Sequence, residues 1–167
     1  KLKYNAKMRA SVIIPCYKRW ELAIQTISGI LPQLSTDMEL IVVYQDDTEV
    51  TEFRKWCNEK GVKYFYSDVP STPRSRNIGA RVALGEILIF FDDDVVLLPN
   101  CIAAHIANYS GPTIDAVGGR VITVRNGAED HVKSGVYRIG QVDKIGRVVG
   151  DQNYNSLVRR ENNTTPL

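Results

Sequence analysis

The sequence lacks any long hydrophobic run. No uninterrupted aliphatic and aromatic stretch is longer than the one at residues 87–91, whereas a helix that crosses a membrane needs about 20 apolar residues. The basic opening at residues 1–7 is not followed by the apolar core of a signal peptide. We therefore expect no transmembrane segment and no secretory leader, and a cytoplasmic protein.

Cysteine is scarce as well. Cys16, Cys57 and Cys101 are odd in number and form no C-x-x-C pair, so the sequence suggests neither a disulfide framework nor a structural zinc site. We interpret all three as small buried apolar residues in a reducing compartment. The glycosylation sequons at residues 108–110 and 162–165 are then chance matches.

No charge of one sign dominates. The 21 Lys and Arg residues oppose 19 Asp and Glu residues, for a net charge of +2, which argues against nucleic acid or an anionic membrane as a partner recognised by charge alone. With 44% hydrophobic and 24% charged residues in 167, the composition predicts one folded domain. Any anion-binding site must be local.

Apolar runs of strand length alternate with amphipathic stretches of helical length. The predicted strands are 11–15, 39–44, 62–66, 86–91 and 116–124, and the predicted helices are 21–34, 49–60, 75–84 and 99–109. This order requires crossover connections, which predict an α/β fold with a mainly parallel sheet covered by helices on both faces. Beyond Arg125 the pattern weakens, and only 136–142 and 147–149 resemble short strands.

Polar residues gather where the predicted strands end, the edge at which open α/β sheets bind ligands. The acidic ones are Asp46, Asp47, Asp68, Asp92, Asp93 and Asp94. Three consecutive carboxylates repel one another, and a bound divalent cation such as Mg or Mn would keep them ionised. Arg74 and Arg76 stand near the start of a predicted helix, whose N-terminal amides favour anions. Singly, Arg74 and Arg76 are better explained as surface residues, and Asp46 and Asp47 as a solvated turn. For the run 92–94, a solvated loop or helix cap is the weaker explanation. Together these features predict a diphosphate site.

Five blocks in order resemble the signature of family 2 glycosyltransferases with the Rossmann-like GT-A fold. They are residues 11–17, 39–47, 76–80, 85–94 and 98–99. The resemblance implies a nucleotide-diphospho-sugar donor, Mn or Mg, and inverting transfer to a hydroxyl of a glycan or lipid-linked acceptor. It also implies polysaccharide or cell-surface glycan assembly, often with peripheral association at the inner membrane face.

The resemblance assigns roles by position. Pro15 and Tyr17 would border the nucleotide base, Asp46 would accept a hydrogen bond from it, and Arg76 would hold the base or the diphosphate. The departure at residues 45–48, where the family more often has Asp-Asp followed by Gly or Asn and Ser, leaves the register between Asp46 and Asp47 open.

The same resemblance assigns roles within the aspartate run, which matches the family's Asp-x-Asp (DXD) motif. Asp93 would face the ribose, Asp94 would coordinate the metal, and Asp92 would support the turn.

The family's catalytic aspartate has no convincing counterpart. Asp130, in the pair at 129–130, is a weak candidate that follows Asp94 too soon, and we interpret the pair as a solvated turn. We therefore expect a single GT-A-type domain (1–167) that is cut short at its C-terminus. Residues 11–124 would form the nucleotide-sugar-binding half, and residues 125–167 the start of an incomplete acceptor-side region.

Two alternatives remain open. In the first, the chain binds a nucleotide sugar without turning it over. Residues 87–96 also fit a phosphohydrolase of the haloacid dehalogenase type, with Asp92 as nucleophile; this ranks lower because a long βα pattern precedes that strand.

Overall fold

The computed structural model describes residues 9–110, 114–119, 124–125, 128–129, 141–142, 148–149 and 156–159. The chain divides into two compact units, residues 1–103 and 104–167. No helix within the described ranges is long and apolar enough to cross a membrane.

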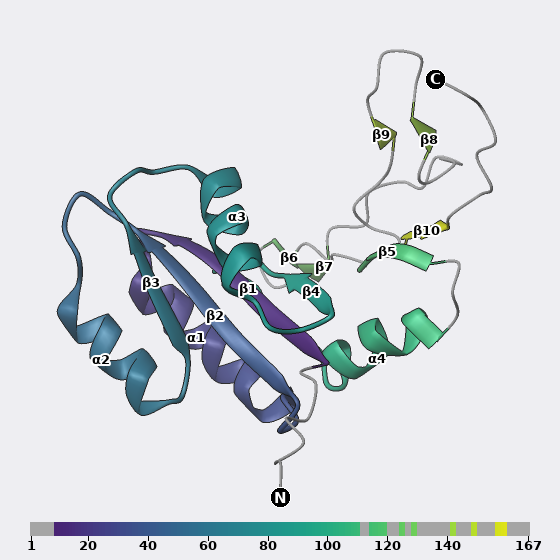
Figure 1. Ribbon diagram of the computed structural model, residues 1–167, viewed down its shortest axis with the longest axis horizontal. Helices are drawn as coiled ribbons and strands as arrows, with labels where there is room; N and C mark the ends of the chain where they lie inside the picture. Colours follow the sequence, from purple (N-terminus) through teal and green to yellow (C-terminus); the bar gives the residue numbers. More distant parts are fainter. Residues whose placement is uncertain are drawn as a thin grey trace, which may run out of the picture. The chain divides into compact units, whose positions relative to one another are not determined.

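The first unit is built on a sheet of four parallel strands (Figure 1). The strands are β1 (Ala10–Tyr17), β2 (Met38–Gln45), β3 (Lys63–Ser67) and β4 (Ile87–Phe90), in the spatial order β3-β2-β1-β4. In this register Ile13 lies beside Ile41 on one side and Phe90 on the other. The two central strands are buried almost end to end, as expected for parallel strands covered on both faces.

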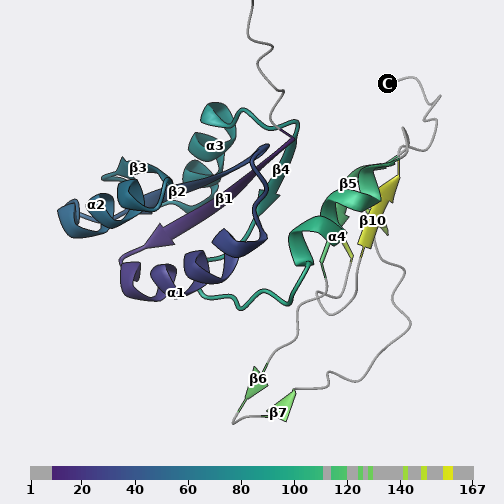
Figure 2. The same ribbon diagram turned by 90° about the horizontal axis from the view of Figure 1, so that it is seen from below.

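Helices cover both faces of this sheet (Figure 2). They are α1 (Trp20–Ile30), which continues into a 3-10 turn (Leu31–Gln33), α2 (Thr51–Glu59) and α3 (Thr72–Val82). On one face, α3 packs Ile78 against Ile13 and Ile41. On the other, Phe53 of α2 contacts the ring of Tyr44, with centroids 5.6 Å apart. The predicted α/β fold with helices on both faces is confirmed.

Helix α3 begins three residues earlier than the apolar pattern predicts. Ser71 precedes it, and its Oγ accepts a hydrogen bond from the amide of Arg74 at 3.4 Å. Pro73 occupies the first turn, where its missing N–H costs nothing. Arg74 therefore lies in the first turn and Arg76 in the second, so the prediction that both guanidinium groups stand at the helix start is wrong for Arg76.

The amino-terminal edge of the sheet is held together by the buried carboxylate of Glu39, which is 7% exposed. Its Oε1 accepts hydrogen bonds from Ser11 Oγ at 2.5 Å and from the amide of Leu84 at 2.6 Å, and its Oε2 pairs with Lys63 Nζ at 2.5 Å. Burial raises the pKa of this carboxyl, but its bonds to Lys63, Ser11 and Leu84 outweigh burial and lower the pKa.

Two glycines allow close packing in the first unit. A Cβ at Gly79 would lie 2.4 Å from Ile13 Cγ2, so α3 touches β1 only because no side chain intervenes. A Cβ at Gly85 would lie 2.4 Å from the backbone carbonyl carbon of Ala10. Gly85 also donates its amide to Ser11 Oγ at 2.9 Å. Both glycines therefore set how closely their segments approach β1.

The second unit contains short strands. Helix α4 (Cys101–Ala107) and a 3-10 turn (Asn108–Ser110) lead into it. Its antiparallel pairs are β5 (Ile114–Gly118) with β10 (Ser156–Arg159), β6 (Val124–Arg125) with β7 (Ala128–Glu129), and β8 (Gln141–Val142) with β9 (Val148–Val149). Of the strand predicted over 116–124, residues 116–118 lie in β5, Gly119 lies outside it, Val124 begins β6, and residues 120–123 lie outside the described residues. Strand β10 was not predicted.

Candidate functional site at the carboxyl edge of the sheet

The carboxyl ends of β2, β1 and β4 are neighbours because β1 pairs with both other strands. Asp46 and Asp47 follow β2, Lys18 and Arg19 follow β1, and the run 92–94 follows β4. The topology therefore brings two acidic groups and a pair of cations to one edge.

At the end of β2, Asp46 is held and Asp47 is not. Asp46 is 21% exposed, whereas Asp47 is 80% exposed. The hydroxyl of Tyr44 donates to Asp46 Oδ2 at 2.8 Å, and the amide of Asp47 donates to Oδ1 at 2.7 Å. The Tyr44 bond, the amide of Asp47 and the ammonium of Lys18 together lower the pKa of Asp46. Asp46 is therefore a fixed, ionised acceptor.

The aspartate run alternates between solvent and interior. The side chains of Asp92 and Asp94 are 61% and 43% exposed, while that of Asp93 is 4% exposed. The hydroxyl of Thr26 on α1 lies 3.0 Å from the carbonyl oxygens of both Asp93 and Val95. This hydroxyl anchors the backbone of the turn to the helix beneath it.

Cationic side chains already face every one of these carboxylates. Arg19 pairs with Asp93 through one terminal nitrogen and with Asp94 Oδ2, at 3.0 Å, through the other. Asp93 and Asp94 raise the pKa of the Arg19 guanidinium. Arg76 donates to Asp92 Oδ1 at 2.8 Å, and its Nε is buried with no partner among the described residues. Part of the countercharge expected from a metal is thus supplied by arginine.

Lys18 and Arg19 are consecutive but serve different acidic groups. Lys18 Nζ lies 2.8 Å from Asp47 Oδ2 and 3.4 Å from Asp46 Oδ1, on the β2 side of the edge, while Arg19 reaches the β4 side. Lys18 has φ of 59°, a left-handed conformation that costs a non-glycine residue about 1–2 kcal/mol. This backbone conformation sends the two consecutive side chains to different acidic groups.

The remaining predicted residues lie as follows. Tyr17 is 45% exposed at the end of β1, and Lys18 Nζ lies 5.5 Å from the centroid of its ring. Pro15 is buried within β1, so its side chain supports the edge from inside. Asp130 lies outside the described residues.

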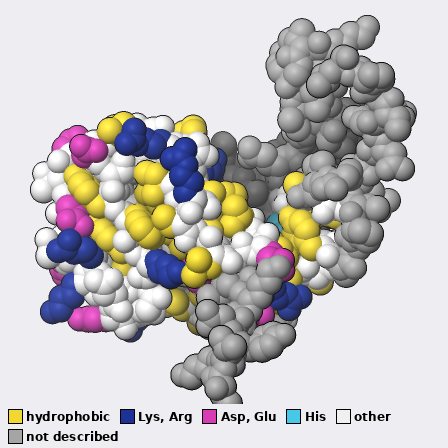
Figure 3. Space-filling view, viewed as in Figure 1, with side chains coloured by type: hydrophobic (Ala, Val, Ile, Leu, Met, Phe, Trp, Pro, Cys, Tyr) yellow, Lys and Arg dark blue, Asp and Glu magenta, His cyan; other side chains and the backbone are white. Residues whose placement is uncertain are grey.

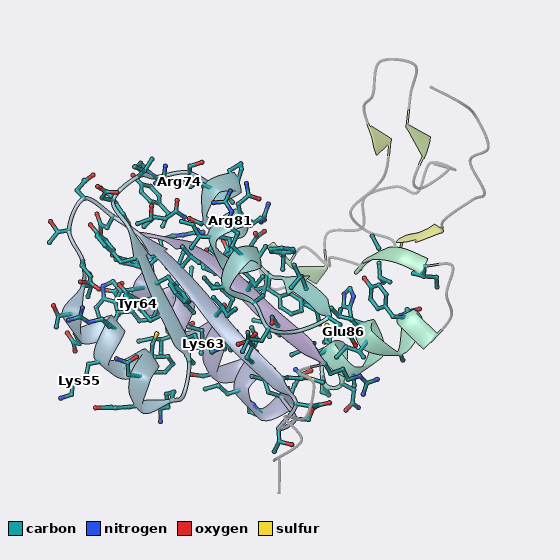
Figure 4. All side chains as sticks on the ribbon, viewed as in Figure 1. Lys55, Lys63, Tyr64, Arg74, Arg81 and Glu86 are labelled. Atoms are coloured by element: carbon teal, nitrogen blue, oxygen red, sulfur yellow. The ribbon has the colours of Figure 1, made fainter. Side chains whose placement is uncertain are left out.

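A separate basic surface lies on the outer side of α3. Figure 3 shows Lys and Arg side chains gathered over this helix, and Figure 4 places Arg74 and Arg81 on it. A shallow pocket of about 470 Å³ is lined by Arg74, Asn77, Ile78 and Arg81. Its lining contains neither Arg76 nor an aspartate, so it is not part of the carboxyl-edge site.

Two of the three cysteines are buried, as predicted for apolar core residues. Cys16 and Cys57 are buried, and Cys101 is partly buried. Burial raises the pKa of Cys57 to about 12. Burial, followed by the neighbouring Asp93, also raises the pKa of Cys16. Neither buried thiol is suited to act as a nucleophile at neutral pH.

Several residues that build the site were not predicted as site residues. Thr26 is the clearest, and its signal was available: it is a polar residue on the face of α1 that also carries buried Ala23, Ile27 and Ile30. Tyr44 gave no signal, because a tyrosine inside an apolar strand is indistinguishable from an ordinary core residue.

An α/β sheet with fixed carboxylates and paired arginines at its carboxyl edge has its polar residues where open α/β folds place their ligand sites. The chain belongs to glycosyl transferase family 2, whose model, described as "Glycosyl transferase family 2", matches residues 11–163. This match decides against the phosphohydrolase alternative.

Curated relatives include an uncharacterized glycosyltransferase of Rickettsia bellii, 33% identical over 94 residues, which cover 55% of this chain and 14% of that protein. Another is the glucosyl-dolichyl phosphate glucuronosyltransferase of Haloferax volcanii, 28% identical over 131 residues, which cover 69% of this chain and 39% of that protein. The chain thus spans well under half the length of these relatives.

Solved structures are similar as well. The mannosyltransferase PcManGT from Pyrobaculum calidifontis, in complex with GDP-Man and Mn2+, matches with a TM-score of 0.59 at 20% identity over 69% of this chain and 36% of that one. S. aureus TarS 1-349 in complex with UDP-GlcNAc matches with a TM-score of 0.52 at 23% identity over 70% of this chain and 37% of that one. These likenesses show the fold, which is GT-A.

Proposed function

We propose that this chain is the donor-binding part of a metal-dependent, inverting glycosyltransferase that uses a nucleotide-diphospho-sugar. The single observation that carries the proposal is the pair of fixed acidic groups, Asp46 and the run 92–94, on either side of the end of β1. Complexes of two similar folds, with GDP-Man and Mn2+ and with UDP-GlcNAc, support it.

In this proposal the β2 side receives the nucleotide base. Asp46 is held in its ionised form and is 21% exposed, so it can accept a hydrogen bond from a base N–H. The exposed ring of Tyr17 offers a flat apolar surface beside it. Pro15, buried in the same strand, would keep the backbone of that wall in place.

The β4 side would hold the ribose and the diphosphate. Asp93 would accept from the ribose, although only 4% of its side chain is exposed and Arg19 already pairs with it. Arg76, paired with Asp92, would contact the diphosphate. Among the described residues no group of three or more His, Cys, Asp or Glu side chains could hold a metal by itself. The donor set nevertheless fits Mg or Mn, which bind through one or two carboxylates and complete their shell with phosphate oxygens and water. Asp94 is the exposed carboxylate suited to this role, and the metal would supply positive charge to the departing diphosphate.

The acceptor side is less constrained. We propose a glycan or lipid-linked acceptor reached from the cytoplasmic face of a membrane. The names of two similar proteins support this. The first is the glucosyl-dolichyl phosphate glucuronosyltransferase of Haloferax volcanii, whose name gives a lipid-linked acceptor. A putative glycosyl transferase of colanic acid biosynthesis in Escherichia coli is 28% identical over 102 residues. Asp130 stays the candidate base; without a base, the chain would bind the donor and not turn it over.

Titration calorimetry with UDP, GDP and dTDP, each with and without Mn, tests the proposal. We expect one nucleotide to bind in the presence of Mn, and Asp94→Asn to abolish the Mn-dependent part. Asp46→Asn should weaken nucleotide binding about tenfold, the effect of losing one charge-assisted hydrogen bond. Asp47→Asn is the matched control, because that side chain faces solvent, and should change affinity less than twofold. Absence of binding by all three nucleotides would refute the donor site.

A further inference from the structure

One arginine side chain occupies both carboxylates that the proposed function assigns to the ribose and the metal. Arg19 contacts Asp93 with one terminal nitrogen and Asp94 with the other. A divalent cation at Asp94 and the guanidinium of Arg19 therefore compete for the same group of oxygens. The inference about Arg19 rests on the proposed function, but its effect on metal binding can be measured separately from nucleotide binding.

We propose that Arg19 is an internal counter-cation that metal and donor displace together from Asp94. Metal arriving alone must break the Arg19 ion pair. When metal arrives with a diphosphate, the diphosphate becomes a new anionic partner for the released guanidinium. The planar guanidinium of arginine pairs with phosphate as well as with carboxylate. Arg19 thereby weakens metal binding to the empty site and makes it depend on the nucleotide.

The backbone at Arg19 is fixed while its side chain can move. The amide of Arg19 donates to Tyr17 O at 2.8 Å, and its carbonyl accepts from the amides of Leu22 at 3.1 Å and Ala23 at 3.0 Å. The side chain, in contrast, is 54% exposed, and Asp94 is 43% exposed. The guanidinium can thus leave Asp94 without any change in the fold.

The two carboxylates that Arg19 contacts differ in exposure, and this difference indicates which ion pair breaks first. Asp93 is 4% exposed and its carbonyl is anchored by Thr26, so removing its only described cation would leave a buried carboxylate unpaired. Asp94 is solvated and can change partner cheaply. We therefore place the exchange at Asp94, with Asp93 keeping Arg19 near the site.

Binding of Mn to the 167-residue chain, followed by electron paramagnetic resonance of free Mn, tests this without any turnover. Arg19→Met should tighten Mn binding in the absence of nucleotide about tenfold, the worth of one charge-assisted contact. UDP, GDP or dTDP, whichever binds, should tighten Mn binding much more in the unaltered chain than in Arg19→Met. Arg19→Lys, which keeps the charge but has only one nitrogen, should lie between them.

Lys18→Met is the matched control. It also removes one positive charge, but Lys18 pairs with Asp46 and Asp47, whereas Arg19 pairs with Asp93 and Asp94. It should change Mn affinity less than twofold. If Arg19→Met fails to fold, seen as loss of its thermal transition, Arg19→Lys carries the test and must bind Mn more tightly than the unaltered chain.

Unchanged or weaker Mn binding in the Arg19 variants, with Mn-dependent nucleotide binding intact, overturns this inference alone. Equal tightening in Lys18→Met also overturns it, since the effect would then be general charge. Failure of every variant to bind Mn, with or without nucleotide, removes the metal from the proposed function as well.

Discussion

Replacing Glu39 by glutamine tests whether the amino-terminal edge of the sheet is held by charge. The amide keeps the shape of the side chain, and its oxygen can still accept from Ser11 Oγ and the Leu84 amide. Its NH₂ group, however, would face Lys63 Nζ, which now lies 2.5 Å from Oε2. The substitution thus removes the ion pair with Lys63 and the charge assistance of the bonds from Ser11 and Leu84, while the shape of the side chain is unchanged.

The expected loss is about 2 kcal/mol of unfolding free energy. A hydrogen bond to a charged group contributes about 1.5–3 kcal/mol. The lower part of that range applies because Lys63, at 42% exposure, can turn to water when its partner is lost. For a chain of this size, the loss lowers the melting temperature by about 4–8 °C.

Urea unfolding followed by tryptophan fluorescence is the assay, since both tryptophans, Trp20 and Trp56, lie in the first unit. The fold lowers the Glu39 pKa below its ordinary value of 4.5, so its ionised form stabilises the fold above that pH, and this stability is lost as pH falls through the lowered pKa. The difference in unfolding free energy between the unaltered chain and Glu39→Gln should therefore be largest at pH 7 and become smaller in acid.

Glu59→Gln is the control, because Glu59 and Lys55 are both exposed and 4.0 Å apart; it should change stability by less than about 0.5 kcal/mol. Equal stability of Glu39→Gln and the unaltered chain at pH 7, or a gap that does not narrow in acid, would refute the reasoning.

Two further predictions concern β1 and the turn after β4. Gly85→Ala should lower the free energy of unfolding by about 2–3 kcal/mol, because its Cβ would overlap the backbone of Ala10. Gly29→Ala in α1, where a Cβ would meet nothing within 4 Å, should instead raise it by about 0.5–1 kcal/mol. Thermal unfolding of both variants checks this. Thr26→Val should lower the free energy of unfolding by about 1–2 kcal/mol and weaken Mn-dependent nucleotide binding, because the carbonyl of Asp93 loses its hydrogen bond. Thr26→Ser should restore both stability and binding. Normal binding by Thr26→Val in calorimetry would contradict the anchoring role.

Much of the first unit follows from local pattern. The β-branched run at 11–15 is buried because it lies between two other strands, and three aspartates directly after residues 87–91 stand at the carboxyl edge for the same topological reason. Apolar periodicity places the start of α3 three residues too late, although Ser71 before Thr-Pro is itself a helix-start signal.

Other features could not be read from the sequence. The divergence of Lys18 and Arg19 depends on a left-handed residue where no glycine or asparagine announces one. The pairing of β10 with β5 joins segments about 40 residues apart in a chain whose local pattern there is weak. Contacts of this kind are decided by tertiary structure, and no local rule carries them.

Strand β1 separates two tasks along its length. Ser11, near its start, belongs to the Glu39 cluster, and Lys18, just past its end, belongs to the ligand edge. Seven residues of extended chain put these ends about 23 Å apart, more than twice the roughly 8–10 Å over which salt screens exposed charges. A charge change at the ligand edge should therefore have little effect on the Glu39 cluster, and residues at that edge can be substituted without much loss of the stability of this sheet.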